Sequence, residues 1–233
     1  MSFSKMSLSG LCALFSLVGT GNGMSQDWPG LEHYKQANAA LPDPAPDEDR
    51  VVFMGNSITI GWLHAVPEFF EGKPYVNRGI GGQTTPQMLL RFRQDVIDLK
   101  PRAVLILAGT NDIAGNTGPM TLDQILDNLK SMADLALAHG IQPVLCSVLP
   151  ASDYPWRPGL RPDSKIPRLN AMIQEYAEER GLVYLDYFSR LANDQNGLDP
   201  SLAEDGVHPT RLGYERMAPL AEKAIQQALE RIR

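Results

Sequence analysis

The chain has little cysteine, few histidines and no block of basic residues, and each scarcity excludes a class of protein. Two cysteines, Cys12 and Cys146, are too few among 233 residues for a disulfide framework. His33, His64 and His139 have no partners at metal-ligand spacing, so we expect no metal site. The net charge is −6 and no Lys/Arg cluster occurs, which argues against a nucleic-acid partner.

The N-terminus lacks an apolar stretch long enough to span a bilayer, so we expect no integral membrane span. A short apolar stretch, residues 8–18, follows the basic Lys5 and precedes small residues that run to Ser25. This pattern predicts a signal peptide over residues 1–25 and export to the periplasm or the medium; a disordered leader is the alternative. Cys12 falls in this segment, outside a lipoprotein pattern, and its removal leaves no intramolecular disulfide.

The rest of the chain has the size and composition of one globular α/β domain, with 43% hydrophobic and 21% charged residues. Within residues 26–50, the stretch 31–40 predicts a short helix, and residues 42–49 form an acidic, proline-rich connector. We assign residues 51–233 to the main domain. No internal repeat or low-complexity segment interrupts it.

Apolar runs and helical patterns alternate along this domain. Five runs predict strands: Val51–Met54, Tyr75–Asn77, Ala103–Leu107, Pro143–Val148 and Leu182–Tyr187. The helical patterns cover 85–99, 122–139, 166–180 and 210 to the C-terminus, with Pro219 expected to kink the last helix. This alternation predicts a five-stranded parallel sheet with helices on both faces, and functional groups at the carboxyl ends of the strands.

Ser57 follows the first strand, and Asp205-Gly206-Val207-His208 lies far downstream. A serine hydroxyl is a weak nucleophile unless a histidine accepts its proton and a carboxylate orients that histidine. We therefore expect Ser57, His208 and Asp205 to be a catalytic triad, although a serine after a strand is more often a helix N-cap. Cys146, in an apolar strand, is expected to be buried; a nucleophilic role for it is the minor alternative.

Two further loops follow predicted strands and could stabilise an oxyanion. Gly82 lies in Gly79-Ile80-Gly81-Gly82, where a glycine lets the backbone N–H approach a ligand. Asn111, in Gly109-Thr110-Asn111-Asp112, could offer its side-chain amide, and the N–H of Ser57 itself would be the third donor. An ordinary turn role is the alternative for both Gly82 and Asn111.

Together these blocks resemble the SGNH/GDSL hydrolase family of esterases and lipases, and look closest to exported, platelet-activating-factor-acetylhydrolase-like members. The blocks are Gly55-Asn56-Ser57, the loop holding Gly82, the loop holding Asn111, and Asp205-Gly206-Val207-His208-Pro209. One departure is Asn56, where the family usually has Asp. The resemblance implies a flavodoxin-like three-layer α/β/α sandwich and ester hydrolysis without a cofactor. Thr59 leaves no Gly-x-Ser-x-Gly, which argues against the larger α/β-hydrolase fold.

The resemblance implies a substrate that is an acyl ester of a small molecule, carbohydrate or lipid. We expect short acyl groups, acetyl on carbohydrate above all, because no long apolar insertion suggests a lipid tunnel. Tyr154 and Trp156, in the loop after the fourth strand, are candidates to contact the substrate, or else pack within that loop. A lysophospholipase or thioesterase is the competing enzyme, and a non-catalytic carbohydrate-binding domain the competing non-enzyme. The oligomeric state is not indicated.

Overall fold

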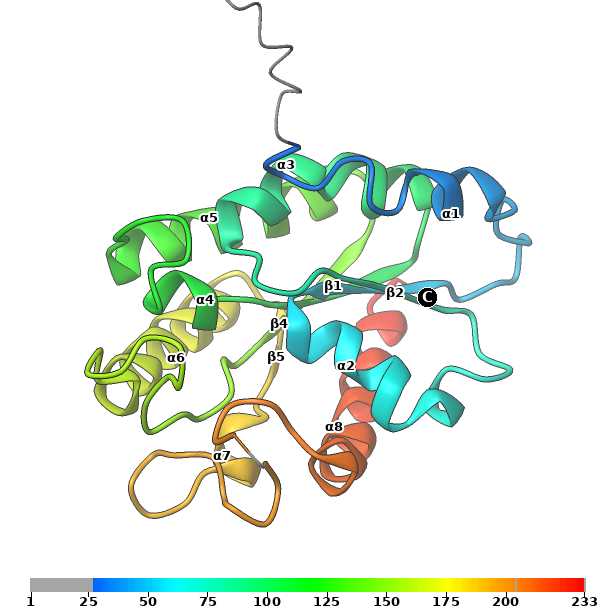
Figure 1. Ribbon diagram of the computed structural model, residues 1–233. Coiled ribbons are helices and arrows are strands. Elements are labelled where there is room, and N and C mark those ends of the chain that lie inside the picture. The colour runs from blue at the N-terminus through cyan, green and yellow to red at the C-terminus, as the bar shows by residue number, and fades with distance from the viewer. Residues whose placement is uncertain (1–26, 204, 233) are drawn as a thin grey trace, which may run out of the picture.

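The computed structural model describes residues 27–203 and 205–232, so the predicted signal peptide lies outside the described residues. A five-stranded sheet in the order β2-β1-β3-β4-β5 forms its centre, and every pair of neighbouring strands is parallel (Figure 1). The strands are β1 (Val51–Gly55), β2 (Tyr75–Gly79), β3 (Ala103–Leu107), β4 (Gln142–Cys146) and β5 (Val183–Leu185). The predicted flavodoxin-like α/β fold is confirmed.

Helices cover both faces of the sheet, which gives the molecule three layers (Figure 1). One face carries α3 (Thr85–Asp95), α5 (Leu122–Ala138) and α6 (Pro162–Glu179), and the other carries α2 (Ser57–Ala65) and α8 (Arg211–Glu230). The shorter elements are α1 (Lys35–Ala40), η1 (Pro67–Phe69), η2 (Ile97–Leu99), α4 (Thr110–Ile113) and α7 (Phe188–Leu191). Among the described residues, no helix is both long and apolar enough to cross a membrane.

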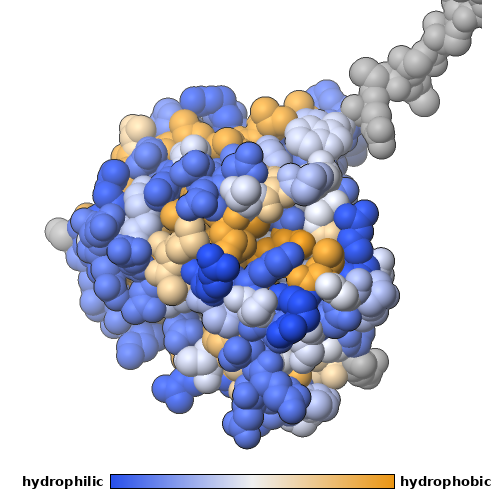
Figure 2. Space-filling model, turned by 90° about the vertical axis from the view of Figure 1, so that its left-hand side faces the viewer, coloured by the Kyte–Doolittle hydropathy of each residue, from blue (hydrophilic) through white to orange (hydrophobic). Residues whose placement is uncertain are grey.

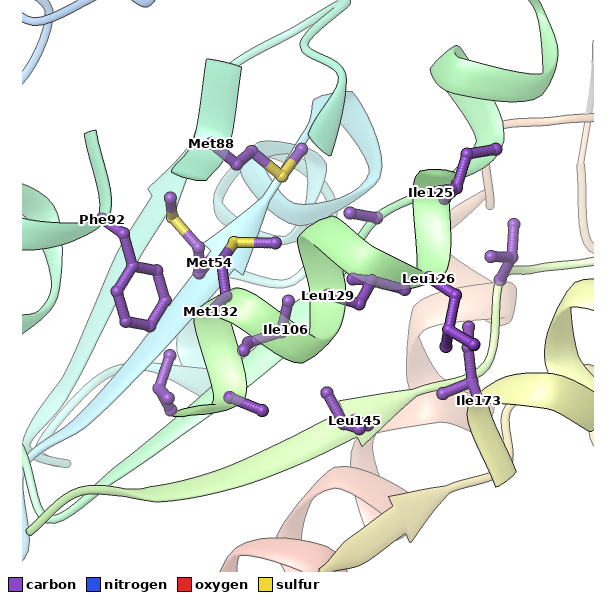
Figure 3. Packing of buried hydrophobic residues seen from close by; sticks show 14 of the residues in the cluster. Met54, Met88, Phe92, Ile106, Ile125, Leu126, Leu129, Met132, Leu145 and Ile173 are labelled. Carbon is purple, nitrogen blue, oxygen red and sulfur yellow. The ribbon is translucent and has the colours of Figure 1, made fainter. Parts of the chain in front are cut away.

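The core is divided by the sheet, because successive side chains of a strand point to opposite faces. Met54 and Ile106 belong to the cluster beneath α3 and α5, whereas Phe53 and Leu105 pack against α2 and α8. Figure 3 shows α3 and α5 directing Met88, Phe92, Ile125, Leu129 and Met132 toward the sheet residues Met54, Ile106 and Leu145. Burial on both faces explains why the strands read as continuous apolar runs.

Several element boundaries differ from the sequence-based prediction. The helix expected over 85–99 is divided, because Val96 leaves helical geometry (φ −130°, ψ −66°) and a short 3₁₀ turn follows. Helix α6 begins at Pro162 rather than at 166, since proline is well tolerated in the first helical turn. Helix α1 begins at Lys35 rather than at 31, and β5 is only three residues long.

The strand order places a topological switch at β1, because the chain moves to β2 on one side and then to β3 on the other. In sheets of this kind the loops after the strands that flank the switch separate and leave a crevice for ligands. Ser57 follows β1 and Asn111 follows β3, so both lie at this crevice.

Candidate active site

Ser57 is held at a tight turn between β1 and α2, where it is the first residue of the helix. The N-cap is Asn56, whose side chain accepts a hydrogen bond of 3.0 Å from the Ile58 N–H. The alternative that Ser57 itself caps the helix is therefore wrong, and Asn in place of the usual Asp preserves the cap. Gly55 allows the turn, since a Cβ there would lie 2.0 Å from the Thr59 hydroxyl.

The structure aligns the three predicted triad residues in a row of hydrogen bonds. Ser57 Oγ lies 2.8 Å from His208 Nε2, and His208 Nδ1 lies 2.6 Å from Asp205 Oδ2. The other carboxylate oxygen of Asp205 accepts the backbone N–H groups of Val207 (2.9 Å) and His208 (2.7 Å). Partial burial alone would raise the pKa of Asp205, but these hydrogen bonds outweigh it and lower that pKa from its ordinary value. The carboxylate therefore stays charged beside the imidazole.

The two predicted oxyanion donors lie next to Ser57. Gly82 adopts a φ of +76°, a left-handed conformation that costs little only for glycine. The loop passes so close that a Cβ on Gly81 would lie 4.0 Å from Ser57 Cβ. Asn111 is buried in α4 and donates one amide hydrogen to the Gln83 carbonyl at 2.9 Å. Its second amide hydrogen remains for a ligand in the cleft.

A cleft of about 270 Å³ brings these groups together. It is lined by six residues: Ser57, Gly82, Asn111, Asn116, Trp156 and His208. The hydroxyl, the imidazole and the two donors thus share one open space in which an acyl carbonyl could lie between nucleophile and amides. This arrangement fits acyl transfer through a tetrahedral intermediate.

Two aromatic residues in the loop after β4 are predicted to contact the substrate, but only Trp156 lines the cleft. Tyr154 is completely buried, with its hydroxyl accepting a 3.0 Å hydrogen bond from Thr110, and burial raises its pKa. Its ring stacks under that of Trp156 at 5.1 Å between centroids. Trp156 is 43% exposed, and its ring centroid lies 6.2 Å from that of His208. The prediction is corrected for Tyr154, which supports Trp156 from below.

Asn116 is a cleft residue that the sequence analysis missed. Its amide donates to the Gly82 carbonyl at 3.1 Å, and its side-chain oxygen accepts the Trp156 indole N–H at 3.3 Å. It therefore ties the oxyanion loop to the aromatic platform. Its position in a polar turn after Asn111 is too common a pattern to have revealed this role.

Other residues singled out from the sequence have structural surroundings. Asp112 is buried, and one of its oxygens accepts the backbone N–H (2.8 Å) and hydroxyl (2.6 Å) of Thr85 at the start of α3. Burial raises its pKa. Cys146 is buried in β4, and burial raises the pKa of its thiol, which opposes a nucleophilic role. No group of three or more candidate metal ligands occurs in the part of the chain that the structure describes.

Comparison with known proteins places the chain among related sequences. The model of the GDSL-like Lipase/Acylhydrolase family matches residues 53–216. The crystal structure of a putative acylhydrolase from Bacteroides fragilis is 46% identical, with a TM-score of 0.85 over 88% of this chain and 99% of that one.

Two curated relatives match in part. An acetylxylan esterase from Xylanibacter ruminicola is 28% identical over 224 residues, which are 80% of this chain and 45% of the relative. An uncharacterized lipoprotein from Bacillus subtilis is 40% identical over 78 residues, 32% of each chain. The chain thus spans less than half the length of either curated relative.

Proposed function

Because the chain belongs to the GDSL-like lipase/acylhydrolase family, we propose that it is a serine esterase that cleaves short acyl esters through an acyl-enzyme. The observation that carries the proposal is the unbroken row of hydrogen bonds from Ser57 through His208 to Asp205. The acetylxylan esterase relative supports the same class of enzyme, the carboxylic ester hydrolases.

The geometry supports a two-step mechanism. His208 Nε2 accepts the proton of Ser57 as Oγ attacks the ester carbonyl, and Asp205 stabilises the imidazolium that forms. The N–H groups of Ser57 and Gly82 and the amide of Asn111 bind the oxyanion. The imidazolium then protonates the departing alcohol. In the second step His208 takes a proton from water, which attacks the acyl-enzyme, and Ser57 is released with its proton restored.

The size of the cleft favours a short acyl group. At about 270 Å³ it has to hold the acyl group and part of the alcohol. A second groove of about 360 Å³ lies between α4, α5 and α6, and its lining mixes apolar residues such as Met120 and Met172 with charged ones such as Arg168. It shares no lining residue with the cleft. Figure 2 shows this side of the molecule, where hydrophobic residues are interrupted by hydrophilic ones. A long acyl chain leaving Ser57 would therefore not enter the groove directly.

We expect the preference for short acyl groups to appear in a series of p-nitrophenyl acetate, butyrate and octanoate. kcat/KM should fall by about tenfold from acetate to octanoate, because forcing a chain that is too long into a small site costs on the order of 1–3 kcal/mol. A site that buried the chain would instead gain roughly 0.8 kcal/mol for each methylene. Ser57→Ala gives the background rate. A rate that rises with chain length would favour a lysophospholipase, and faster cleavage of an acetyl thioester would favour a thioesterase.

Carbohydrate is the proposed alcohol because Trp156 forms an exposed, supported aromatic platform beside His208. The leaving alcohol must lie near the imidazole that protonates it, so a sugar ring could stack on the indole. The acetylxylan esterase relative favours such a substrate. A non-catalytic carbohydrate-binding domain remains the rival, and a fluorophosphonate probe separates them because only an activated serine reacts.

Trp156→Ala should raise KM for an acetylated xylo-oligosaccharide about tenfold, as the loss of one stacking contact predicts. The KM for p-nitrophenyl acetate should stay within about twofold of the wild-type value. Trp28→Ala is the matched control, since Trp28 is also 43% exposed and does not line the cleft. Equal effects of Trp156→Ala on both substrates would contradict the sugar platform.

Export is the proposed location. It is supported by the basic and apolar pattern at the N-terminus, and the lipoprotein from Bacillus subtilis is compatible with it. The assignment to the platelet-activating-factor-acetylhydrolase-like branch stays a prediction.

A further inference from the structure

Gln83 joins the oxyanion loop to the interior of the protein. It is only 4% exposed, and its side-chain oxygen accepts the Arg91 Nε–H at 2.6 Å. Its side-chain amide donates to the Pro29 carbonyl at 2.7 Å, and its own carbonyl accepts the Asn111 amide at 2.9 Å. Gln83 is therefore fixed from two sides while it contacts one proposed oxyanion donor and directly follows Gly82, the other.

Arg91 connects the same loop to the nucleophile turn. Its side chain is completely buried and forms an ion pair with the equally buried Asp95 at 2.9 Å. The other terminal nitrogen donates to the Gly55 carbonyl at 3.0 Å, two residues before Ser57 in the chain. One rigid, planar guanidinium thus contacts both the turn that carries Ser57 and the side chain of Gln83.

We infer that Gln83 and Arg91 are positioning residues that fix the distance and direction of the oxyanion donors relative to Ser57. The Asn111 amide has two hydrogens, and the Gln83 carbonyl binds one of them, which leaves the other for a ligand in the cleft that Asn111 lines. If Gln83 were free to shift, Asn111 and the Gly82 N–H would shift with it. Donors must be in place before charge develops on the oxygen, and a displacement of about 1 Å can cost 100-fold in rate.

The inference rests on the proposed function, and Gln83→Leu tests it on p-nitrophenyl acetate. We expect kcat to fall about 10- to 100-fold with KM within about twofold, because only the charged transition state needs aligned donors. The pH midpoint of kcat/KM should not move, since the triad is untouched. Gln83→Glu keeps the acceptor for Arg91 but loses the donor to the Pro29 carbonyl, so its kcat should lie between those of Gln83→Leu and the wild type.

Gln94→Leu is the matched control. Gln94 also donates to a carbonyl of the N-terminal segment, that of Leu31 at 2.7 Å, and more weakly to Asp95 at 3.4 Å. It has no hydrogen bond to the oxyanion loop among the described residues. Its kcat should stay within about twofold of wild type. If Gln83→Leu does not fold, Gln83→Ala replaces it with the same expected result.

Two results would overturn the inference. One is an unchanged kcat in Gln83→Leu. The other is a loss of kcat in both Gln83→Leu and Gln94→Leu that follows the drop in Tm of each variant, because the loss would then reflect lower stability alone. The proposed function fails separately, if Ser57→Ala retains activity. An inactive Ser57→Ala beside a fully active Gln83→Leu removes the inference and leaves the proposed function intact.

Discussion

Ser57→Ala should lower kcat for p-nitrophenyl acetate on the order of 10⁶-fold. The hydroxyl that is lost lies 2.8 Å from the base that would activate it, and alanine supplies no nucleophile to the same position. Fluorophosphonate labelling of the chain should disappear together with the activity. Steady-state kinetics and intact-mass analysis of the purified, folded protein check both results.

Ser131→Ala is the control for this experiment. Ser131 is an exposed serine of α5 whose hydroxyl donates to the Asp127 carbonyl at 2.8 Å, and no histidine of the described residues hydrogen-bonds to it. Activity and labelling should both survive, and the Tm of both variants should stay close to that of the wild type. Hydrolysis that persists in Ser57→Ala would remove Ser57 as the nucleophile.

Asp205→Asn should lower kcat about 10³- to 10⁴-fold while leaving the fold intact. The side-chain oxygen of asparagine can still accept the backbone N–H groups of Val207 and His208, so its NH₂ must face His208 Nδ1. An NH₂ group favours the tautomer whose proton is on Nε2. That nitrogen then donates to Ser57 and cannot accept its proton.

The pH dependence of this variant gives a second readout. The hydrogen bonds to Asp205 lower its pKa from the ordinary value of an aspartate. The stabilising charge is therefore fully present above the unfolded-state pKa and is lost only as the pH falls through the folded-state pKa. Wild-type activity near pH 5 is thus not limited by protonation of Asp205, and Asp205→Asn should be impaired across the whole range from pH 5 to 9.

Asp186→Asn is the matched control, because Asp186 also accepts a backbone N–H, that of Ser189 at 3.0 Å, and has no histidine partner in the part of the chain that the structure describes. Its kcat should equal that of the wild type. An Asp205→Asn enzyme with more than a tenth of wild-type kcat would show that His208 is oriented without the carboxylate.

The fold and the proposed triad could be predicted because both depend on local patterns. Strands buried on both faces must be apolar throughout, which is why Val51–Gly55 and Ala103–Leu107 stand out from the amphipathic helices between them. Parallel strands direct their carboxyl ends to one edge, so residues after β1, β2 and β3 must meet there. The motif around Asp205 and His208 is compact enough for one loop to present both side chains.

The contacts that only the tertiary structure decided link segments far apart in the chain. Tyr154 and Trp156 occupy the same loop, yet one is buried and the other half exposed, because burial depends on what α4 places against each ring. Gln83 lies in a loop and Arg91 in a helix, and neither position stands out in the sequence. Their hydrogen-bond partners, Gly55, Pro29 and Asn111, come from three other segments of the chain. The sequence by itself therefore determined the α/β sheet and the order of the proposed catalytic groups along it. The support that fixes those groups was decided by packing, since a buried polar side chain takes whichever donors and acceptors the fold brings to it.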